Sequence, residues 1–590
     1  MNPNLMTSLD NRDLPPDVRK RVAQWLSGPY DQATKEEIGR LLLQDPQALI
    51  DAFYTDLAFG TGGMRALMGV GTSRLNLYTI QMATQGVAQY LKREKKEKTL
   101  SAVIGFDSRH HSEEFAWMAA RVLAGNGITT YLLTQLRPTP FISFACRQKK
   151  ADIGIMITAS HNPKEYNGYK VYWSDGAQVV HPHDVGIVEE VYRIQSPAEV
   201  HVAVKNSPLL IPLSDELDLP YLAAIRPLQH FPQENKTKGS DLKIIYTPLH
   251  GTGITLTPRA LRDWGFTSVE NVSAQSAPDG DFPTVAFPNP EYPEALKLGI
   301  DLLKNSHSDI LIANDPDADR MGIALMHQGQ SVILSGNQVA ALCVDFICRV
   351  LTTLPKHEQG AFVTTIVSTE LIAEIAKKHQ LACFEVLTGF KYIGQKIHEW
   401  ETSQPSYQFL FGAEESYGYL IGTHARDKDA IVTSCLIAEM ALHAKLQGKT
   451  LVDLLRAIYQ TYGVFREKQA SHAFEPTKEE WDKMKQKMER LRKHPPEKIA
   501  GKKVLYIEDY AAGVRLYPQT AKIEPLSLSA SDVLLFRLGD QSRLIIRPSG
   551  TEPKIKIYAS VRAPPSPSID EVIVKCDEEL DALLNWTLAI

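Results

Sequence analysis

Short apolar, β-branched runs alternate with longer segments of helical period through most of this chain of 590 residues. One such stretch runs from 100 to 133, and the same rhythm returns from about 242 to 313 and from about 361 to 387. Alternation of this kind is typical of α/β folds, in which helices connect parallel strands. The pattern therefore predicts three successive α/β units of similar length, although no repeated residue pattern links them.

Polar or proline-bearing segments at 207–218, 329–337 and 466–476 mark candidate boundaries between units. A Lys- and Glu-rich helical stretch and three strand-like runs follow the last of them, which predicts a distinct C-terminal unit. Several domains are expected because a single hydrophobic core rarely exceeds about 250 to 300 residues. We expect four domains, at 1–210, 211–328, 329–465 and 466–590.

The composition is that of an ordinary globular protein, with a hydrophobic fraction of 44% and a charged fraction of 23%. A formal net charge of -5 argues against a nucleic-acid partner, which usually meets a basic surface. No run approaches the length of a membrane-spanning helix, so we expect no membrane partner. The 6 cysteines form no CxxC pair, which fits reduced thiols and a cytoplasmic location.

A serine follows one of the predicted strands. Residues 158–163 read Thr-Ala-Ser-His-Asn-Pro, directly after the apolar run Ile153–Ile157. The carboxyl ends of strands in α/β sheets carry functional sites, so we expect Ser160 to be exposed there. A serine hydroxyl needs a base or a metal to become a good nucleophile. An ordinary turn ended by proline is the alternative interpretation.

Three aspartates alternate in a tight loop after another apolar run: Asp315, Asp317 and Asp319. Carboxylates so spaced converge on one hard cation and leave positions open for a phosphate oxygen, which predicts a magnesium site. An EF-hand calcium loop would need glycine at its sixth position and glutamate at its twelfth, where this chain has Arg320 and Met326. A plain acidic turn remains the other alternative.

Two further loops carry polar groups suited to a sugar phosphate. Glu414 and Ser416 follow the strand-like run Phe409–Phe411, and a carboxylate with a nearby hydroxyl can bind neighbouring sugar hydroxyls. Residues 547–553 read Arg-Pro-Ser-Gly-Thr-Glu-Pro, which suits a phosphate clamp with a planar guanidinium. A helix N-terminus is the alternative for the first loop, and a tight hairpin for the second.

In this order the four loops closely resemble the α-D-phosphohexomutase superfamily, in the branch with bacterial phosphoglucomutase/phosphomannomutase and animal phosphoglucomutase-2 and phosphopentomutase. The resemblance extends from about Phe59 to about Tyr558 and includes Phe-Gly-Thr-Gly-Gly-Met-Arg at 59–65 and Thr-Gly-Phe-Lys at 388–391. It implies four domains around a central cleft, three related α/β units with mixed sheets and a smaller α+β C-terminal domain. Each domain would supply one of the loops.

The resemblance implies roles for the matching positions. The metal ligands would be Ser160, through its phosphoryl oxygen, and Asp315, Asp317 and Asp319. The catalytic group would comprise Ser160, His161, Lys170, Arg65 and Arg320. The substrate-binding group would comprise Thr388, Gly389, Lys391, Glu414, Ser416, Arg547, Ser549, Gly550 and Thr551. Asp107 and Arg109 match a further element near the site, where a structural ion pair and a direct role are both open.

The implied activity interconverts hexose 1-phosphate and hexose 6-phosphate, of glucose or mannose. A phosphorylated Ser160 would donate to the free sugar hydroxyl, and the resulting 1,6-bisphosphate would turn and return its other phosphate. One Mg²⁺ per chain, glucose 1,6-bisphosphate or a similar activator, and a monomer or weak dimer are expected. The alternatives are a phosphopentomutase or a glucose 1,6-bisphosphate synthase, a phosphatase, and a catalytically inactive sensor.

Overall fold

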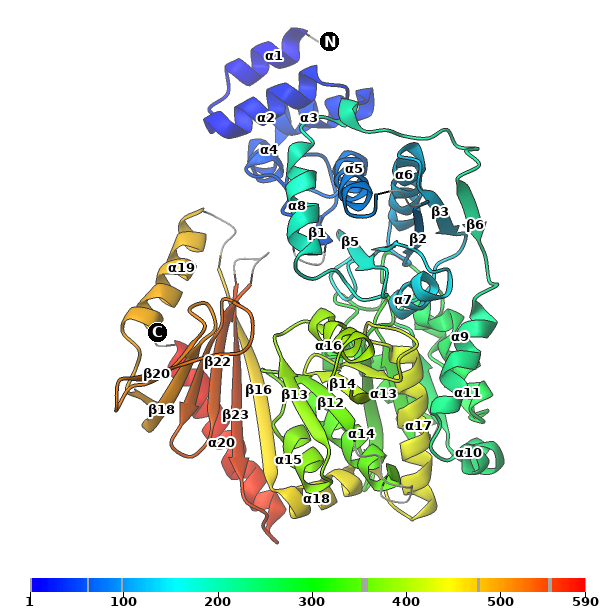
Figure 1. Ribbon diagram of the computed structural model, residues 1–590, viewed down its shortest axis with the longest axis vertical. Coiled ribbons are helices and arrows are strands. Elements are labelled where there is room, and N and C mark those ends of the chain that lie inside the picture. Colours follow the sequence, from blue (N-terminus) through cyan, green and yellow to red (C-terminus); the bar gives the residue numbers. More distant parts are fainter. Residues whose placement is uncertain are drawn as a thin grey trace. The chain divides into compact units, whose positions relative to one another are not determined.

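The computed structural model describes residues 3–60, 63–96, 99–351, 359–474, 478–549 and 554–588. The chain forms two compact units (Figure 1). Unit 1 comprises Met1–Met326 with Leu420–Ala438, and unit 2 comprises His327–Tyr419 with Glu439–Ile590. Among the described residues, no helix combines the length and the apolar character needed to cross a membrane.

Four N-terminal helices open unit 1: α1 (Pro3–Asp10), α2 (Pro16–Ser27), α3 (Gln32–Gln44) and α4 (Pro46–Phe53). Asp31 and Asp45 cap α3 and α4 by accepting backbone N–H bonds, which satisfies donors that a helix start leaves unpaired. Trp25 and Phe53 lie in their shared apolar core, with Tyr78 of the next segment packed against it.

A mixed six-stranded sheet follows, in the order β1-β5-β4-β2-β3-β6. Strands β2, β3, β4 and β6 are parallel, and β5 lies antiparallel to both of its neighbours, β4 and β1. The strands are β1 (Gly63–Leu67), β2 (Ser101–Phe106), β3 (Thr129–Leu133), β4 (Ile153–Ile157), β5 (Tyr166–Trp173) and β6 (Leu210–Leu213). The helices are α5 (Leu77–Glu94), α6 (Ser112–Gly125), α7 (Thr139–Gln148) and α8 (His183–Arg193).

In the second α/β layer of unit 1, the buried strands β7 and β9 are parallel, β8 lies parallel to β7, and β10 lies antiparallel to β9. Its strands are β7 (Ile244–Thr247), β8 (Val269–Asn271), β9 (Ile310–Asn314) and β10 (Met321–His327). Its helices are α9 (Asp218–Ile225), α10 (Pro232–Lys238), α11 (Thr257–Asp263), α12 (Ser273–Ser276) and α13 (Pro293–Asn305). The expected strand–helix–strand order is confirmed.

Unit 2 begins with β11 (Gln330–Leu334) and contains a four-stranded sheet in the order β13-β12-β14-β15. Strand β12 (Gly360–Thr365) lies parallel to β13 (Ala382–Val386) and β14 (Gln408–Glu414), and β15 (Gly418–Ile421) follows. The helices of unit 2 include α14 (Gly336–Leu351), α15 (Leu371–Lys378), α16 (Phe390–Thr402) and α18 (Leu451–Tyr462), whereas α17 (Ala430–Leu446) begins in unit 1 and ends in unit 2.

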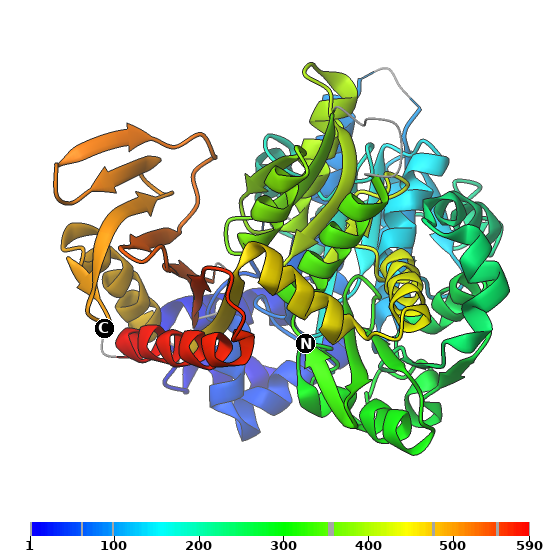
Figure 2. The same ribbon diagram turned by 90° about the horizontal axis from the view of Figure 1, so that it is seen from below.

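The C-terminal part is mostly an antiparallel sheet in the order β16-β23-β22-β21-β18-β19-β20, with β17 beside β18. The strands are β16 (Val464–Ala473), β17 (Lys498–Ile499), β18 (Lys502–Asp509), β19 (Val514–Tyr517), β20 (Lys522–Pro525), β21 (Leu534–Leu538), β22 (Arg543–Pro548) and β23 (Lys554–Ala563). Helix α20 (Ile569–Leu588) packs along β16 and β23 (Figure 2), and α19 (Lys478–Lys493) precedes β17.

Strand β16 runs as far as Ala473, through most of the polar segment 466–476 that was expected to hold a boundary. An edge strand needs an apolar face on one side only, so its alternate residues stay polar and resemble a linker in sequence. The predicted fold class is confirmed: three α/β units with mixed sheets and a smaller C-terminal α+β unit. The residue limits of the four domains stay a prediction.

Candidate active site

Ser160 lies in the turn between β4 and β5, in the left-handed backbone region with φ of 53°. Its hydroxyl donates to Oδ2 of Asp315 at 2.7 Å, and its backbone N–H donates to Oγ1 of Thr158 at 2.8 Å. The expected exposure of Ser160 is wrong, since only 2% of the residue is accessible. The contact with the aspartate loop accounts for this burial.

The aspartate loop connects the antiparallel strands β9 and β10. Oδ1 of Asp315 accepts the backbone N–H groups of Asp319 and Arg320 at 3.1 and 2.9 Å, which closes the turn. A second loop supports it, because Thr252 donates its backbone N–H to the Pro316 carbonyl at 2.7 Å. A Cβ at the neighbouring Gly251 would approach Pro316 to 2.2 Å, so only glycine fits there.

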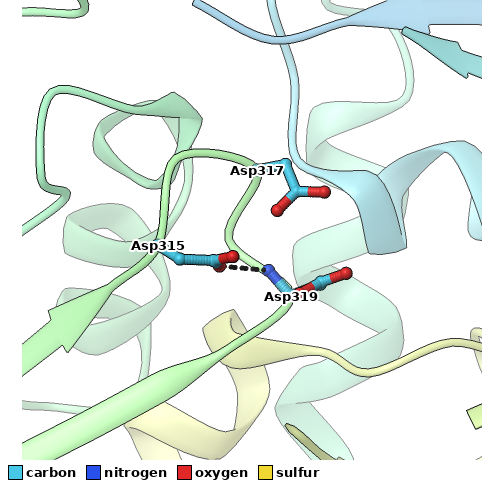
Figure 3. Close-up of side chains that lie close together, drawn as sticks. All are labelled: Asp315, Asp317 and Asp319. Atoms are coloured by element: carbon cyan, nitrogen blue, oxygen red, sulfur yellow. Dashed lines mark hydrogen bonds between the residues drawn. The ribbon is translucent and has the colours of Figure 1, made fainter. Parts of the chain in front are cut away.

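The three aspartates face one another (Figure 3). One carboxylate oxygen from each lies within 4.8 Å of the others, and all three residues are buried. Oδ1 of Asp317 and Oδ1 of Asp319 have no hydrogen-bond partner among the described residues. Buried carboxylate oxygens that lack a donor are suited to a hard cation, so this group fits a divalent metal.

The pKa values of the aspartates reflect their burial and the repulsion between their carboxylates. Burial, and then the charges of Asp317 and Asp319, raise the pKa of Asp315 well above its ordinary value. Burial would also raise the pKa of Asp317, but contact with Lys170 outweighs it and lowers that pKa. A divalent cation relieves this like-charge repulsion.

Two ammonium groups contact the aspartates. Nζ of Lys170, on β5, lies 2.7 Å from Oδ2 of Asp317 and 2.9 Å from Oδ2 of Asp319. Burial would lower the pKa of Lys170, but the two carboxylates raise it above its ordinary value, so Lys170 is a cation at neutral pH. Nζ of Lys428 lies 3.2 Å from Oδ2 of Asp319 and 3.0 Å from Oδ1 of Asp427.

The other predicted catalytic residues lie around the same turn. Nδ1 of His161 is 3.2 Å from the Ser160 hydroxyl oxygen. Arg65, on β1, donates to Oδ1 of Asn162 at 2.8 Å. The guanidinium of Arg320 lies 3.4 Å from Oε1 of Glu291 and 4.0 Å from Oδ1 of Asp319. Unit 1 therefore brings together the whole predicted catalytic and metal-binding group.

Sequence reasoning missed Lys428 and Thr139. Oγ1 of Thr139 donates to Oδ2 of Asp317 at 2.6 Å. Lys428 belongs to the charged run 426–429 before the apolar helix α17, and charged runs usually lie on solvated faces. This run is buried, and Oδ2 of Asp427 accepts a hydrogen bond from the Tyr172 hydroxyl at 2.8 Å. The position of this charged run directly before an apolar helix is the sequence feature that could have indicated its burial.

Unit 2 holds the residues predicted to bind sugar hydroxyls. Glu414 is the last residue of β14, a correction to the loop expected there, and its Oε1 accepts the Gly389 N–H at 3.0 Å. Gly389 has φ of 125°, which favours glycine. Thr388 precedes that glycine and Lys391 lies two residues after it, with Lys391 Nζ 5.0 Å from the centre of the Tyr392 ring. Ser416 lies half-buried in the turn before β15.

The predicted phosphate clamp lies at the end of the C-terminal sheet. Arg547 is part of β22, opposite Lys556 of β23, so it lies in a strand rather than in a loop. Ser549 donates its backbone N–H to the Lys554 carbonyl at 2.8 Å. Gly550 and Thr551 lie outside the described residues.

Comparison with known proteins relates most of the chain to one family. Models of the phosphoglucomutase/phosphomannomutase α/β/α domains I, II and III match residues 56–198, 220–328 and 335–462. A phosphoglucomutase of Staphylococcus haemolyticus is 39% identical over 516 residues, covering 86% of this chain and 91% of that relative. One from Staphylococcus aureus strain N315 is 38% identical and covers 87% and 91%.

Two solved structures share the fold. Parafusin, a phosphoglucomutase of Paramecium in its open form, has a TM-score of 0.63 at 17% identity and covers 90% of this chain and 96% of its own. A Thermus thermophilus chain, provisionally assigned as a phosphomannomutase, has a TM-score of 0.66 at 21% identity and covers 91% and 99%. Since three domain models and relatives above 30% identity span most of its length, the chain belongs to the phosphoglucomutase/phosphomannomutase family of the α-D-phosphohexomutase superfamily.

Proposed function

We propose that this chain interconverts hexose 1-phosphate and hexose 6-phosphate, of glucose or mannose or both, through a phosphorylated Ser160 and a sugar 1,6-bisphosphate. Family membership makes the chain a phosphosugar mutase, which is an isomerase. The observation that carries the proposal is the 2.7 Å contact between the Ser160 hydroxyl and Asp315 of the aspartate loop. That contact places a nucleophilic oxygen beside a group able to bind a divalent cation.

The proposed cation is Mg²⁺, one per chain, held by Asp315, Asp317 and Asp319. When bound, it would offset negative charge on the group being transferred. The chain's own cations act on the same charge: Lys170 and Lys428 through their ammonium groups, and Arg320 through its guanidinium. Lys170 is suited to charge stabilisation, because its Nζ lies 2.7 and 2.9 Å from carboxylate oxygens of Asp317 and Asp319.

Ser160 would act in both directions of transfer. In the first half-reaction a sugar hydroxyl oxygen bonds to phosphorus as the bond from phosphorus to Oγ breaks, the proton of that hydroxyl passes to Oγ, and the sugar becomes a bisphosphate. In the second, Oγ bonds to the phosphorus of the other phosphoryl group as the bond from that phosphorus to the sugar oxygen breaks, and the Oγ proton, which is donated to Asp315 in this structure, passes to the freed sugar oxygen. His161 and Arg65 are proposed to assist charge and proton movement at this oxygen.

The remaining predicted residues would hold the substrate. The residues proposed to bind the sugar hydroxyls are Thr388, Gly389, Lys391, Glu414 and Ser416. The proposed clamp for the phosphate that is not transferred is Arg547, Ser549, Gly550 and Thr551. Because the bisphosphate must bind in two orientations, adaptable polar contacts suit this site better than a tight apolar pocket.

Side-by-side assays of glucose, mannose and pentose 1-phosphates test the proposal, with and without glucose 1,6-bisphosphate as the proposed activator. We expect hexose 6-phosphate as the main product and no release of free phosphate. Preferred turnover of ribose 1-phosphate would instead show a phosphopentomutase, and net accumulation of bisphosphate would show a synthase. Release of phosphate without isomerised sugar would show a phosphatase.

The proposed setting is the cytoplasm, with the enzyme working as a monomer or weak dimer. All 6 cysteines lie among the described residues and are free thiols, which supports a reducing compartment. Gel filtration with light scattering would test the oligomeric state.

A further inference from the structure

The guanidinium of Arg109 binds the backbone of the turn that carries Ser160. Nη2 donates to the carbonyl of Ser160 at 2.6 Å and also to that of Asn162. Nη1 donates to the carbonyls of Pro163 and Tyr166 at 2.8 and 3.0 Å. One side chain thus binds four carbonyls of a single seven-residue segment, 160–166.

Arg109 is itself fixed in place. Its Nε lies 3.3 Å from Oδ2 of Asp107, and both side chains are completely buried. Oδ1 of Asp107 accepts the Arg109 backbone N–H at 3.0 Å and the Ser112 hydroxyl at 2.7 Å. The centre of the Phe282 ring lies 5.0 Å from the guanidinium carbon of Arg109. These contacts hold the planar guanidinium of Arg109 in a fixed orientation. A lysine in its place would keep the positive charge but lose the planar arrangement of hydrogen-bond donors.

The turn needs such support because Ser160 has φ of 53°. A residue with a side chain in this region is strained and persists there only when its surroundings fix it. Arg109 binds the carbonyl of Ser160 itself, so it restrains the backbone from which Oγ projects toward Asp315. An ion pair with Asp107 alone would not require any of the four carbonyl bonds.

We propose that Arg109 is the positioning residue of the phosphoryl-transfer step, holding the Ser160 turn so that Oγ stays aligned with the aspartate loop. This inference rests on the proposed function of Ser160. Arg109 acts through the backbone and does not touch the reacting atoms. Its loss should therefore act on transfer and leave sugar binding largely unchanged, since the predicted sugar-binding residues belong to unit 2.

The test compares Arg109→Lys with Arg121→Lys in the full-length enzyme. Arg121 also lies in unit 1 and donates its Nε–H to the carbonyl of Ala203 at 2.8 Å, outside the Ser160 turn. For Arg109→Lys we expect kcat to fall about a hundredfold, the typical cost of a misplacement near 1 Å, with little change in KM. The ³¹P resonance of the phosphorylated enzyme should shift or broaden in Arg109→Lys only.

A kcat for Arg109→Lys within threefold of wild type, or a rise in KM alone, would overturn the proposal. So would an equal loss in Arg121→Lys. If Arg109→Lys does not fold, Asp107→Asn serves instead, since it leaves Arg109 present but less firmly held. We then expect roughly a tenfold fall in kcat and the same ³¹P change, and wild-type values of both would overturn the proposal. A wild-type enzyme without mutase activity would defeat the proposed function instead.

Discussion

The hydroxyl of Ser160 and the carboxylate of Asp315 lie 2.7 Å apart although 155 positions separate them in the chain. Ser160 follows β4 and Asp315 follows β9, so strands of two different sheets deliver them to one place. Packing of the two α/β layers of unit 1 therefore decides whether the proposed nucleophile meets the metal-binding group. Substitutions that separate the two loops should affect phosphoryl transfer before they affect sugar binding.

Replacing Lys428 should slow the reaction. Its ammonium lies 3.2 Å from Asp319 in a buried position, where a lost charge is poorly replaced by water. We expect Lys428→Gln to lower kcat about a hundredfold, a typical loss for one preorganised charge-stabilising group. The matched control is Lys445→Gln, at an exposed position of α17, which should keep wild-type kinetics. Equal kcat values for the two variants would show that Lys428 has only a structural role.

Removal of the metal should abolish activity. Three buried carboxylates repel one another without a cation, so chelator should inactivate the enzyme and Mg²⁺ should restore it. Added Mg²⁺ should also raise the Tm, because it binds only the folded state. Metal analysis should find one ion per wild-type chain, less in Asp317→Asn, and an unchanged amount in Asp301→Asn, an exposed position of α13. Full activity in excess chelator would leave the aspartate loop with a purely structural role.

Arg547 should contribute to both binding and turnover. A charge-assisted hydrogen bond to phosphate contributes about 1.5 to 3 kcal/mol. Arg547→Ala should therefore lower kcat/KM roughly tenfold to a few hundredfold. Arg547→Lys should retain only part of the kcat/KM that Arg547→Ala loses, because an ammonium lacks the planar set of donors of a guanidinium. Arg562→Ala, on the neighbouring strand β23, is the control. Wild-type kcat and KM in Arg547→Ala would show that the phosphate is held elsewhere.

Glu370 should stabilise unit 2 in a pH-dependent way. Its carboxylate makes two hydrogen bonds to Arg537, at 2.6 and 3.0 Å. Burial alone would raise the pKa of Glu370, but Arg543 and Arg537 lower it below the ordinary value of 4.5. A depressed carboxyl pKa stabilises the fold above the unfolded-state pKa, and this contribution is lost as pH falls through the folded-state pKa.

Glu370→Gln should thus lower the free energy of unfolding by about 1.5 to 3 kcal/mol at pH 7, measured by urea denaturation. The difference from wild type should shrink below pH 4.5, the ordinary value. Glu374→Gln is the control, because Glu374 is 42% exposed and lies 3.7 Å from Arg562, where an ion pair contributes about 0 to 1 kcal/mol. If the free energy of unfolding of Glu370→Gln stays below that of wild type by the same amount from pH 7 to pH 3, the ionised Glu370 carboxylate is not the source of the stabilisation.

Local sequence patterns predicted the elements that carry the proposed nucleophile and the metal ligands. The strand β4 begins and ends at the predicted residues, because β-branched apolar runs bounded by turn residues specify buried strands locally. The spacing of the aspartates was enough to predict their convergence. The loops that follow strands could therefore be found without tertiary information.

Non-local contacts account for what sequence could not predict. Lys428 lies in a buried charged run whose Asp427 accepts a hydrogen bond from Tyr172, a residue 255 positions away. The burial of Ser160 likewise depends on Asp315 of another sheet. The hydrogen bonds from Arg109 to the Ser160 turn depend on the pairing of β2 with β4, which brings the two turns together. The sequence alone therefore could not decide whether Arg109 pairs only with Asp107. No local period or motif encodes such contacts.

Phosphopeptide mapping of the wild type and Ser160→Ala is the most direct test of the proposed phosphoserine mechanism. Both proteins would be incubated with glucose 1,6-bisphosphate and analysed by intact mass, with mutase assays in parallel. The wild type should carry one phosphoryl group on Ser160, and Ser160→Ala should carry none and lose activity by several orders of magnitude while staying folded. Loss of one buried hydroxyl costs only about 1 kcal/mol of stability. An active Ser160→Ala enzyme, or a wild type phosphorylated at another residue during turnover, would contradict the mechanism.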